Sequence, residues 1–287
     1  MKKLFTLGLF IISATAFAQE KITINEEMVT IDGSARNSLT VILVGSNTDD
    51  ATKAWKKELK NMKGKVSDKT FVFGDDCTLK EMGDNSFDVY SLVEEAAKGA
   101  RLVAAFDLGG AYLSTEVHPT KYPIAEKFIY GFAVEQAKSV VALEIETNEK
   151  ALKDLEKDQS GLKKDEEKEE KDVEDYKAKI EENKTAIAQN IINQANKQKE
   201  VHRLEGSQIE GQIEEVQKVI KGFKKELAGL VKDKTLLEKD NQNLLEKIKN
   251  SNSDIKKNVK NQAEKKAEIE ALKEVVKNLG VKLNSIK

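Results

Sequence analysis

Residues 209–248 read IEGQIEEVQKVIKGFKKELAGLVKDKTLLEKDNQNLLEKI, and this stretch decides the fold of the chain. Apolar side chains recur in it at alternating steps of three and four residues. The series continues without a skip to Leu279, and fifteen of its twenty-one positions are apolar. A 3.5-residue repeat sustained over 71 residues predicts a helix of a left-handed coiled coil. Its first seam residues are Ile209, Ile213, Val216, Ile220, Phe223, Leu227 and Leu230.

A second heptad series precedes this stretch and runs from Leu152 to Leu204, with nine apolar residues at sixteen positions. Its polar positions gather in two places. They are either solvated sections or residues that set the register, the oligomeric state or a partner site, since polar seam residues specify pairing at a cost in stability. The residues in question are Glu166, Glu169, Asn190, Gln194 and Lys197.

The two heptad series are out of phase, because the step that joins them is five residues long. Within that step Gly206 is suited to the left-handed conformation that ends a helix. Ser207, followed three residues later by Glu210, has the spacing of a capping box that begins the next helix. We therefore predict an antiparallel helical hairpin with its turn near residues 205–208. One continuous helix that tolerates a glycine is the alternative.

Composition divides the chain into two parts. Over its 287 residues 34% are charged and 6% are aromatic, yet eleven aromatic residues lie within 19–132 and only two within 133–287. Pro123, the last proline of the sequence, suits the first turn of a helix. We predict an α+β fold, with a small sheet domain that has one helix, followed by the hairpin. The predicted boundaries are 19–121 for the sheet domain, 122–280 for the hairpin and 281–287 for a tail.

The sheet domain is predicted from β-branched runs bounded by glycine, aspartate and serine. A helix from Thr48 to Met62 carries its apolar residues on one face, including Trp55. About 100 residues can bury one modest core, so a sheet with this helix on its face is the expected packing. The predicted strands are Ile22–Ile31, Leu39–Val44, Thr70–Phe73, Phe87–Val93, Leu102–Leu108 and Ala111–Thr115.

The first eighteen residues have the pattern of a secretory signal peptide. Lys2 and Lys3 precede a short apolar run, and the small residues Ala16 and Ala18 lie at the two positions that a signal peptidase reads before a cleavage site between Ala18 and Gln19. An uncleaved membrane anchor is the alternative, but the apolar run is short for a span of about 20 residues. We therefore expect an exported protein in the periplasm, the envelope or the extracellular space, without stable membrane insertion after cleavage.

The hairpin prediction also locates the end of the chain. A reversal near residues 205–208 pairs Leu279 with Val134, beside the sheet domain. Gly280 is then placed to end the second helix. The last residues, VKLNSIK, are predicted to be either an added edge strand or a frayed tail.

Few residues offer chemistry. Cys77 is the single cysteine, which excludes an internal disulfide and a four-cysteine zinc site. Asp75 and Asp76 could add ligands with Asp84 or His118, but metal sites need four or more convergent ligands at defined spacing. No glycine-rich phosphate-binding motif occurs, and a net charge of −2 argues against nucleic acid. We expect no catalytic residue, no cofactor, no metal and no enzymatic activity.

These features predict a non-catalytic coiled-coil scaffold, spacer or adaptor whose partners are other proteins or further copies of itself. The alternatives are a periplasmic holdase chaperone with helical tentacles and a coiled-coil activator of an envelope enzyme. The predicted architecture is similar to that of Skp-type periplasmic chaperones, which join a small β body to helical hairpins. Those proteins are shorter and basic, whereas this chain is slightly acidic.

Overall fold

The computed structural model describes residues 21–207 and 213–287, which divide into two compact units. The first unit combines the residues up to Leu152 with those from Ala271 to the C-terminus, and the second is Lys153–Glu270. The predicted signal peptide, with its cleavage site between Ala18 and Gln19, lies outside the described residues. The α+β fold class and the long helical hairpin are confirmed.

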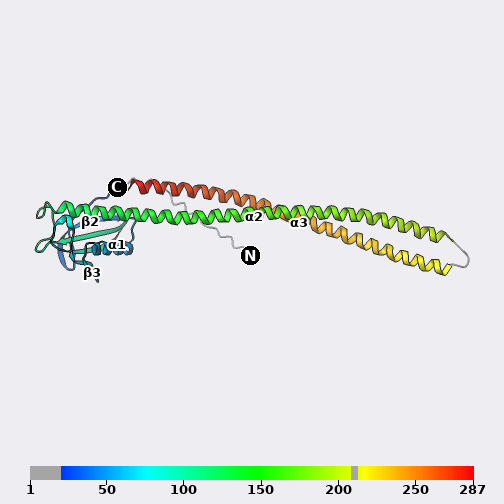
Figure 1. Ribbon diagram of the computed structural model, residues 1–287, viewed down its shortest axis with the longest axis horizontal. Coiled ribbons are helices and arrows are strands. Elements are labelled where there is room, and N and C mark those ends of the chain that lie inside the picture. Colours follow the sequence, from blue (N-terminus) through cyan, green and yellow to red (C-terminus); the bar gives the residue numbers. More distant parts are fainter. Residues whose placement is uncertain (1–20, 208–212) are drawn as a thin grey trace. The chain divides into compact units, whose positions relative to one another are not determined.

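The first unit is built on a six-stranded antiparallel sheet (Figure 1). Its strand order is β1-β2-β6-β5-β4-β3, so two hairpins, β1-β2 and β5-β6, meet where β2 pairs with β6. Every connection between neighbouring strands is therefore local except the one from β2 to β6. The strands are β1 (Asn25–Ile31), β2 (Ser34–Val44), β3 (Lys65–Asp68), β4 (Val72–Cys77), β5 (Phe87–Ala96) and β6 (Gly99–Asp107).

Two strand predictions need correction. Gly74 was expected to stop a strand, but it lies inside β4. A β-carbon there would be 2.8 Å from the sulfur of Cys77 and would press on Leu59, so glycine serves close packing rather than a turn. The predicted strand over Ala111–Thr115 forms only an isolated bridge, between Asp107 and Tyr112. Strand β3 was not predicted, because its sequence KVSD is short and polar.

Helix α1 (Thr48–Asn61) begins at the predicted residue and ends one residue before the predicted end. Asn47, not Thr48, is the N-cap, and its side-chain oxygen accepts a hydrogen bond of 2.8 Å from the backbone N–H of Asp50. Trp55 and Leu59 are fully buried on the predicted apolar face. A 3₁₀ turn, η1 (Lys80–Met82), follows β4 and buries Met82.

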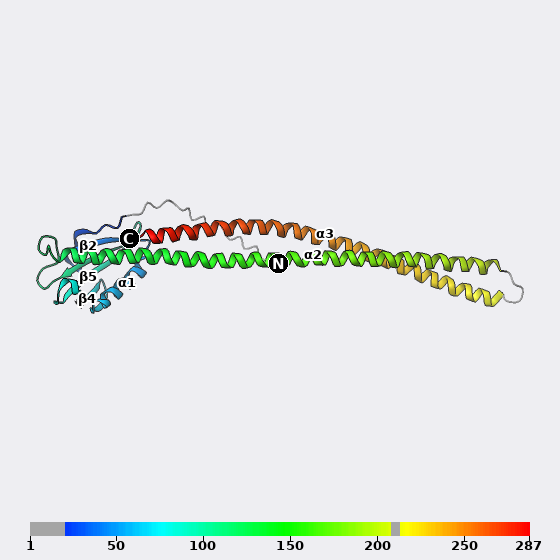
Figure 2. The same ribbon diagram turned by 45° about the horizontal axis from the view of Figure 1, so that its top comes forward.

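The main core lies between one sheet face and two helices, α1 and the first turns of α2 (Tyr122–Gly206) (Figure 2). Trp55 is its largest member, and its ring packs edge-on against Phe132 with centroids 5.1 Å apart. The indole N–H of Trp55 donates to the hydroxyl of Ser91 at 2.8 Å, with both side chains fully buried. The sheet contributes Leu39, Val41, Leu43, Val89, Leu102 and Phe106, and α2 contributes Ala125 and Ile129.

The opposite face of the sheet carries a smaller apolar cluster of Ile31, Val103 and Ala105. Arg36 covers it, since its guanidinium lies 4.1 Å from the ring centroid of Tyr90 and donates to Ile31 O and to the hydroxyl of Tyr112. The charge is therefore satisfied by oxygen atoms and an aromatic face.

The C-terminal end of helix α3 (Ile213–Ser285) differs from the prediction. The helix does not stop at Gly280, which lacks a positive φ and is followed by helical residues through Ser285. Of the two alternatives predicted for residues 281–287, the edge strand is therefore wrong, and the chain is helical to Ser285 rather than a frayed tail. A single glycine costs a helix only about 1 kcal/mol, which the surrounding helix overrides.

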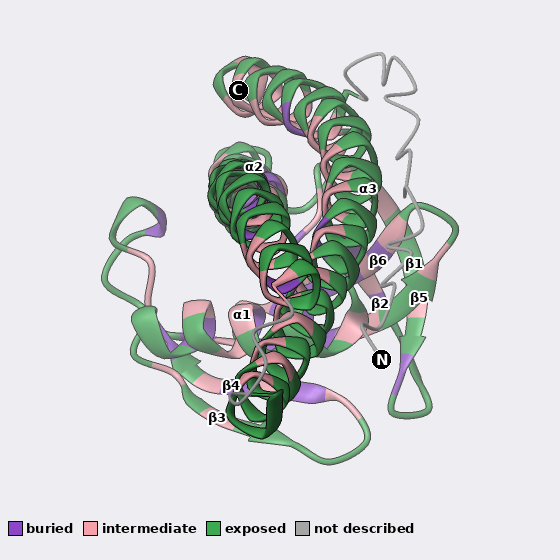
Figure 3. Cartoon of the chain, turned by 90° about the vertical axis from the view of Figure 1, so that its right-hand side faces the viewer, coloured by how far each residue is buried: buried purple, intermediate pink, exposed green. Residues whose placement is uncertain are grey.

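In the second unit α2 and α3 run antiparallel and pair through the predicted heptad positions. Asn183 donates to Asn241 at 2.9 Å, whereas a reversal at residues 205–208 would have placed Leu230 opposite Asn183. The predicted register was therefore wrong by eleven residues, the difference between Leu230 and Asn241 as the residue opposite Asn183. Figure 3 shows the exposed outer faces of both helices in green and the less exposed inner stripe in pink and purple.

We predict that Ser91→Ala destabilises the first unit by about 1–3 kcal/mol, because the buried indole N–H of Trp55 loses its acceptor. Urea unfolding followed by Trp55 fluorescence measures the loss. Ser34→Ala, at an exposed position of β2, is the matched control and should change stability by less than about 0.5 kcal/mol. Equal effects of the two substitutions would contradict the assigned hydrogen bond.

Candidate functional site

The first unit contains a groove of about 680 Å³, which we call the head groove. It lies among the segment before β1, the end of β2, the β5-β6 turn, the early part of α2 and the last residues of α3. Its apolar walls include Val44, Val140, Val141 and Ile286. These segments are far apart in sequence, so the groove cannot be predicted from a short sequence motif.

Gly45 lets the end of β2 approach α2 at the floor of the groove, and Gly99 lets the β5-β6 turn approach β2. Gly45 has φ +76°, and a β-carbon on it would lie 3.0 Å from the Cγ1 atom of Val140. Its backbone N–H donates to Lys98 O at 2.8 Å, which joins the end of β2 to the β5-β6 turn. Gly99, with φ +146°, sits against the backbone of Leu43. Both positions therefore need glycine for conformation and for space.

The last turn of α3 forms one wall of the groove. The hydroxyl of Tyr130 donates to Lys287 O at 2.9 Å, and Lys282 lies 3.9 Å from the carboxylate of Glu144. The hydroxyl of Ser285 donates back to Lys282 O and ends the helix. These contacts hold the C-terminal residues against α2 within the first unit.

The rim of the head groove is mainly basic. Four lysines and one glutamate, Glu144, border the apolar walls. An apolar trough with ammonium groups at its edge suits an apolar ligand that carries an anionic group. The lysines are Lys21, Lys98, Lys282 and Lys287.

Asp75 and Asp76, near the end of β4, form an acidic cluster, but their partner is Asp88 rather than the predicted Asp84 or His118. Carboxylate oxygens of Asp75, Asp76 and Asp88 lie within 4.8 Å of one another, while neither Asp84 nor His118 belongs to this group. Lys65 already pairs with Asp75 at 3.6 Å and with Asp76 at 3.1 Å. The carboxylate of Asp88 also accepts the backbone N–H of Asp76. These contacts give the cluster a structural role at the β3-β4 hairpin.

Cys77 is a core residue. Its side chain is fully buried beside Leu59 and Gly74. Burial, together with the negative charges of Asp88, Asp75 and Asp76, raises the pKa of the Cys77 thiol to about 12. The thiolate that a nucleophile or metal ligand requires is therefore suppressed at neutral pH.

The residues predicted for the hairpin turn are only partly described. Gly206 is the last residue of α2 and lacks the left-handed conformation expected for it. The hydroxyl of Ser207 donates to Leu204 O at 2.9 Å, so it closes α2. Ile209 and Glu210 lie outside the described residues, and the predicted capping box stays a prediction.

The predicted seam of α3 has a regular burial pattern. Ile213, next to the turn, is 57% exposed. The other described members are partly buried while their neighbours are exposed, as expected of a helix that has one partner helix. They are Val216, Ile220, Phe223, Leu227 and Leu230.

Several polar positions of the seam have hydrogen-bond or ion-pair partners. Asn183 donates to both Asp240 and Asn241, and Gln262 donates to Glu166. The remaining contacts follow the same rule: Asn258 with Leu162 O, Gln194 with Asn190, and Lys197 with Glu226 and the ring of Phe223. This pattern favours a role in register over a merely solvated section.

We predict that Cys77 does not react with a thiol reagent at pH 8 in the folded chain, because burial and the nearby carboxylates suppress the thiolate. The same chain in 6 M guanidinium should be labelled at the rate of a free cysteine. Mass spectrometry of timed samples measures the two rates. Rapid stoichiometric labelling of the folded chain would contradict the assigned burial.

We predict that Gly45→Ala destabilises the first unit more than Gly33→Ala does. Both glycines have positive φ, of +76° and +74°, so both substitutions carry a backbone strain of about 1–2 kcal/mol. Only at Gly45 does the new methyl group also press on Val140, whereas Gly33 has no atom within 4 Å. The difference between the two unfolding free energies isolates the crowding at the groove floor, and a zero difference would contradict it.

Comparisons of the chain with protein-family models, with curated proteins and with solved structures gave no match. Within residues 21–207 and 213–287, no helix combines the length and the apolar character needed to cross a membrane. The function is therefore argued from the geometry of the two units.

Proposed function

We propose that the protein is an exported, non-catalytic adaptor or spacer of the cell envelope that binds other proteins. The observation that carries the proposal is the internally paired seam of the hairpin, in which polar and charged residues bond across or along the two helices. Because the polar side chains of the seam bond to each other, the two helices form a stiff pair. Residues 153–206 of α2 alone span roughly 80 Å at 1.5 Å per residue.

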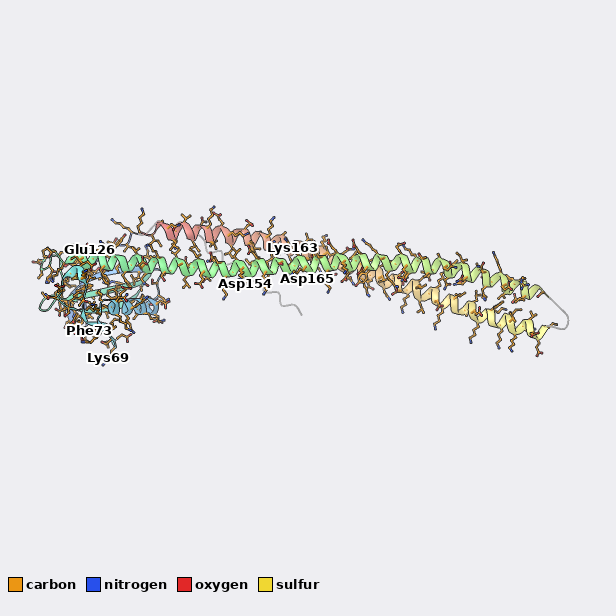
Figure 4. The ribbon with its side chains drawn as sticks, in the orientation of Figure 1. Lys69, Phe73, Glu126, Asp154, Lys163 and Asp165 are labelled. Atoms are coloured by element: carbon orange, nitrogen blue, oxygen red, sulfur yellow. The ribbon has the colours of Figure 1, made fainter. Side chains whose placement is uncertain are left out.

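The surface of the hairpin supports a role in protein contact. Charged side chains project along both helices, among them Lys163 and Asp165 of the run KKDEEKEE (Figure 4). Several ion pairs link residues three or four apart on one helix, such as Lys179 with Glu182 and Lys234 with Glu238. Such pairs keep an exposed helix soluble and stable.

Export is the second part of the proposal and rests on the sequence of the first eighteen residues. A basic start, an apolar run and small residues before Gln19 suit a cleaved signal peptide. The chain would then act in the periplasm, the envelope or the extracellular space. A single buried cysteine, without a disulfide, is compatible with that compartment.

A holdase chaperone is the second candidate, and exposed apolar residues on the hairpin favour it. Ile191, Ile192 and Leu245 are each about half exposed in a chain that is otherwise rich in charge. Clients that lack structure bind to apolar surface of this kind. A holdase delays aggregation of an unfolded client at near-stoichiometric ratios, whereas an adaptor has no such effect.

The adaptor proposal predicts that hairpin length matters. Deleting residues 166–179 together with 245–258 removes two heptads from each helix and keeps the layer of Asn183 and Asn241 in register. The hairpin should fold but shorten by roughly 21 Å. Cross-linking in cells, followed by affinity purification and mass spectrometry, should recover fewer partners with the shortened chain than with the natural one.

The control deletes residues 166–179 alone, which leaves the helices unpaired over two heptads and should lower the helical content measured by circular dichroism. Recovery of the same partners at the same yield from the doubly shortened chain would contradict a spacer role. Recovery of self-contacts alone, combined with delayed client aggregation, would favour the holdase.

A further inference from the structure

One section of the hairpin inverts the usual amphipathic pattern. Residues 185–196, TAIAQNIINQAN, contain no charged residue in a chain that is 34% charged. In this section the seam holds Asn190, buried to 8% exposure, with Gln194 bonded to it. The apolar residues Ile191 and Ile192 are instead 49% and 53% exposed. Polar residues inside and isoleucine outside are unfavourable for an isolated helix pair.

One exposed apolar side chain of each helix, Ile191 on α2 and Val231 on α3, lies on the same flank of the hairpin. Glu205 of α2 and Lys224 of α3 form an ion pair of 2.8 Å on that flank. Ile191 lies two heptads before Glu205, and Val231 lies one heptad after Lys224. Because residues a heptad apart point in the same direction, Ile191 and Val231 belong to the flank that the ion pair defines. Val231 is 49% exposed.

Along this flank, basic residues lie on one side of the apolar centre and an acidic residue lies on the other side. At heptad spacing, α2 presents Lys177, Lys184, Ile191, Gln198 and Glu205. On α3 the same spacing presents Lys224, Val231 and Glu238, which are followed by the exposed Leu245. The order therefore runs from basic through apolar to acidic on both helices.

We propose that a second copy of this chain docks on this flank, with the two hairpins antiparallel about a two-fold axis through Ile191 and Val231. Each isoleucine and each valine then meets its own equivalent. Lys177 lies opposite Glu205 of the second copy, and Lys224 lies opposite its Glu238. Such a self-complementary patch is what a two-fold interface requires.

The opposite flank of the hairpin does not offer the same match. Asp240 marks that flank, since it accepts the side chain of Asn183 across the seam. On α3, residues at heptad spacing from it are mainly acidic, so a second copy would meet like charges there. The acidic residues are Glu226, Asp233, Asp254 and Glu268, and Lys247 is the basic residue between Asp233 and Asp254.

Light scattering after gel filtration tests the proposal on the chain as the cell processes it. We expect the natural chain to have twice the mass of one chain at tens of micromolar. Ile191→Glu and Val231→Glu should each raise the dissociation constant at least tenfold, because equal charges then meet at the axis. Ile192→Glu and Leu236→Glu change residues of similar exposure that point away from the flank, and should leave the mass doubled.

Cysteine cross-linking tests the two-fold axis itself. Ile191→Cys should form a covalent dimer on mild oxidation, because the two equivalent positions meet at the axis, whereas Ile192→Cys should not. The native Cys77 is buried and does not compete. A natural chain that stays monomeric at tens of micromolar overturns the proposal, and so does a dimer whose mass is unaffected by Ile191→Glu. Circular dichroism of each variant shows that the helices remain folded.

Discussion

The pairing of α2 with α3 in one register is the constraint on which the rest of the structure depends. Apolar heptads alone would tolerate a shift of seven residues, because leucine and isoleucine recur at each step. The polar positions remove that freedom. A shift by one heptad would move Gln262 away from Glu166 and place the carboxylate against Ile255 or Ile269. Burying the unpaired carboxylate of Glu166 in an apolar seam costs far more free energy than the shifted helices gain from apolar contacts.

The sheet unit is stabilised differently. In it, a few buried hydrogen bonds fix the positions of large side chains that pack against an apolar core. Trp55 fills the space between α1, α2 and the sheet, and its N–H is satisfied by Ser91. Arg36 plays the matching part on the other face, where oxygen atoms and the ring of Tyr90 surround its charge. In both cases a large amphipathic side chain closes a cluster and is held by hydrogen bonds.

Local patterns were predictable where one element decides the outcome. The heptad seam and the apolar face of α1 both follow from spacing within a single segment. Gly74 and Gly280 were misread as stop signals, because glycine is also used for close packing and is tolerated in a long helix. The head groove escaped prediction altogether. Its walls come from five segments that only the folded chain brings together.

The sequence by itself determined that the chain forms a small α+β unit and a heptad-paired hairpin, since the repeat and the aromatic content are properties of the chain alone. Only the tertiary structure decided which heptads face each other and where the groove lies. The physical reason is that alignments of the two helices that differ by one heptad have nearly equal apolar packing energies. Cross-helix contacts such as Asn183 with Asn241 select among them, and those contacts exist only once the chain has reversed.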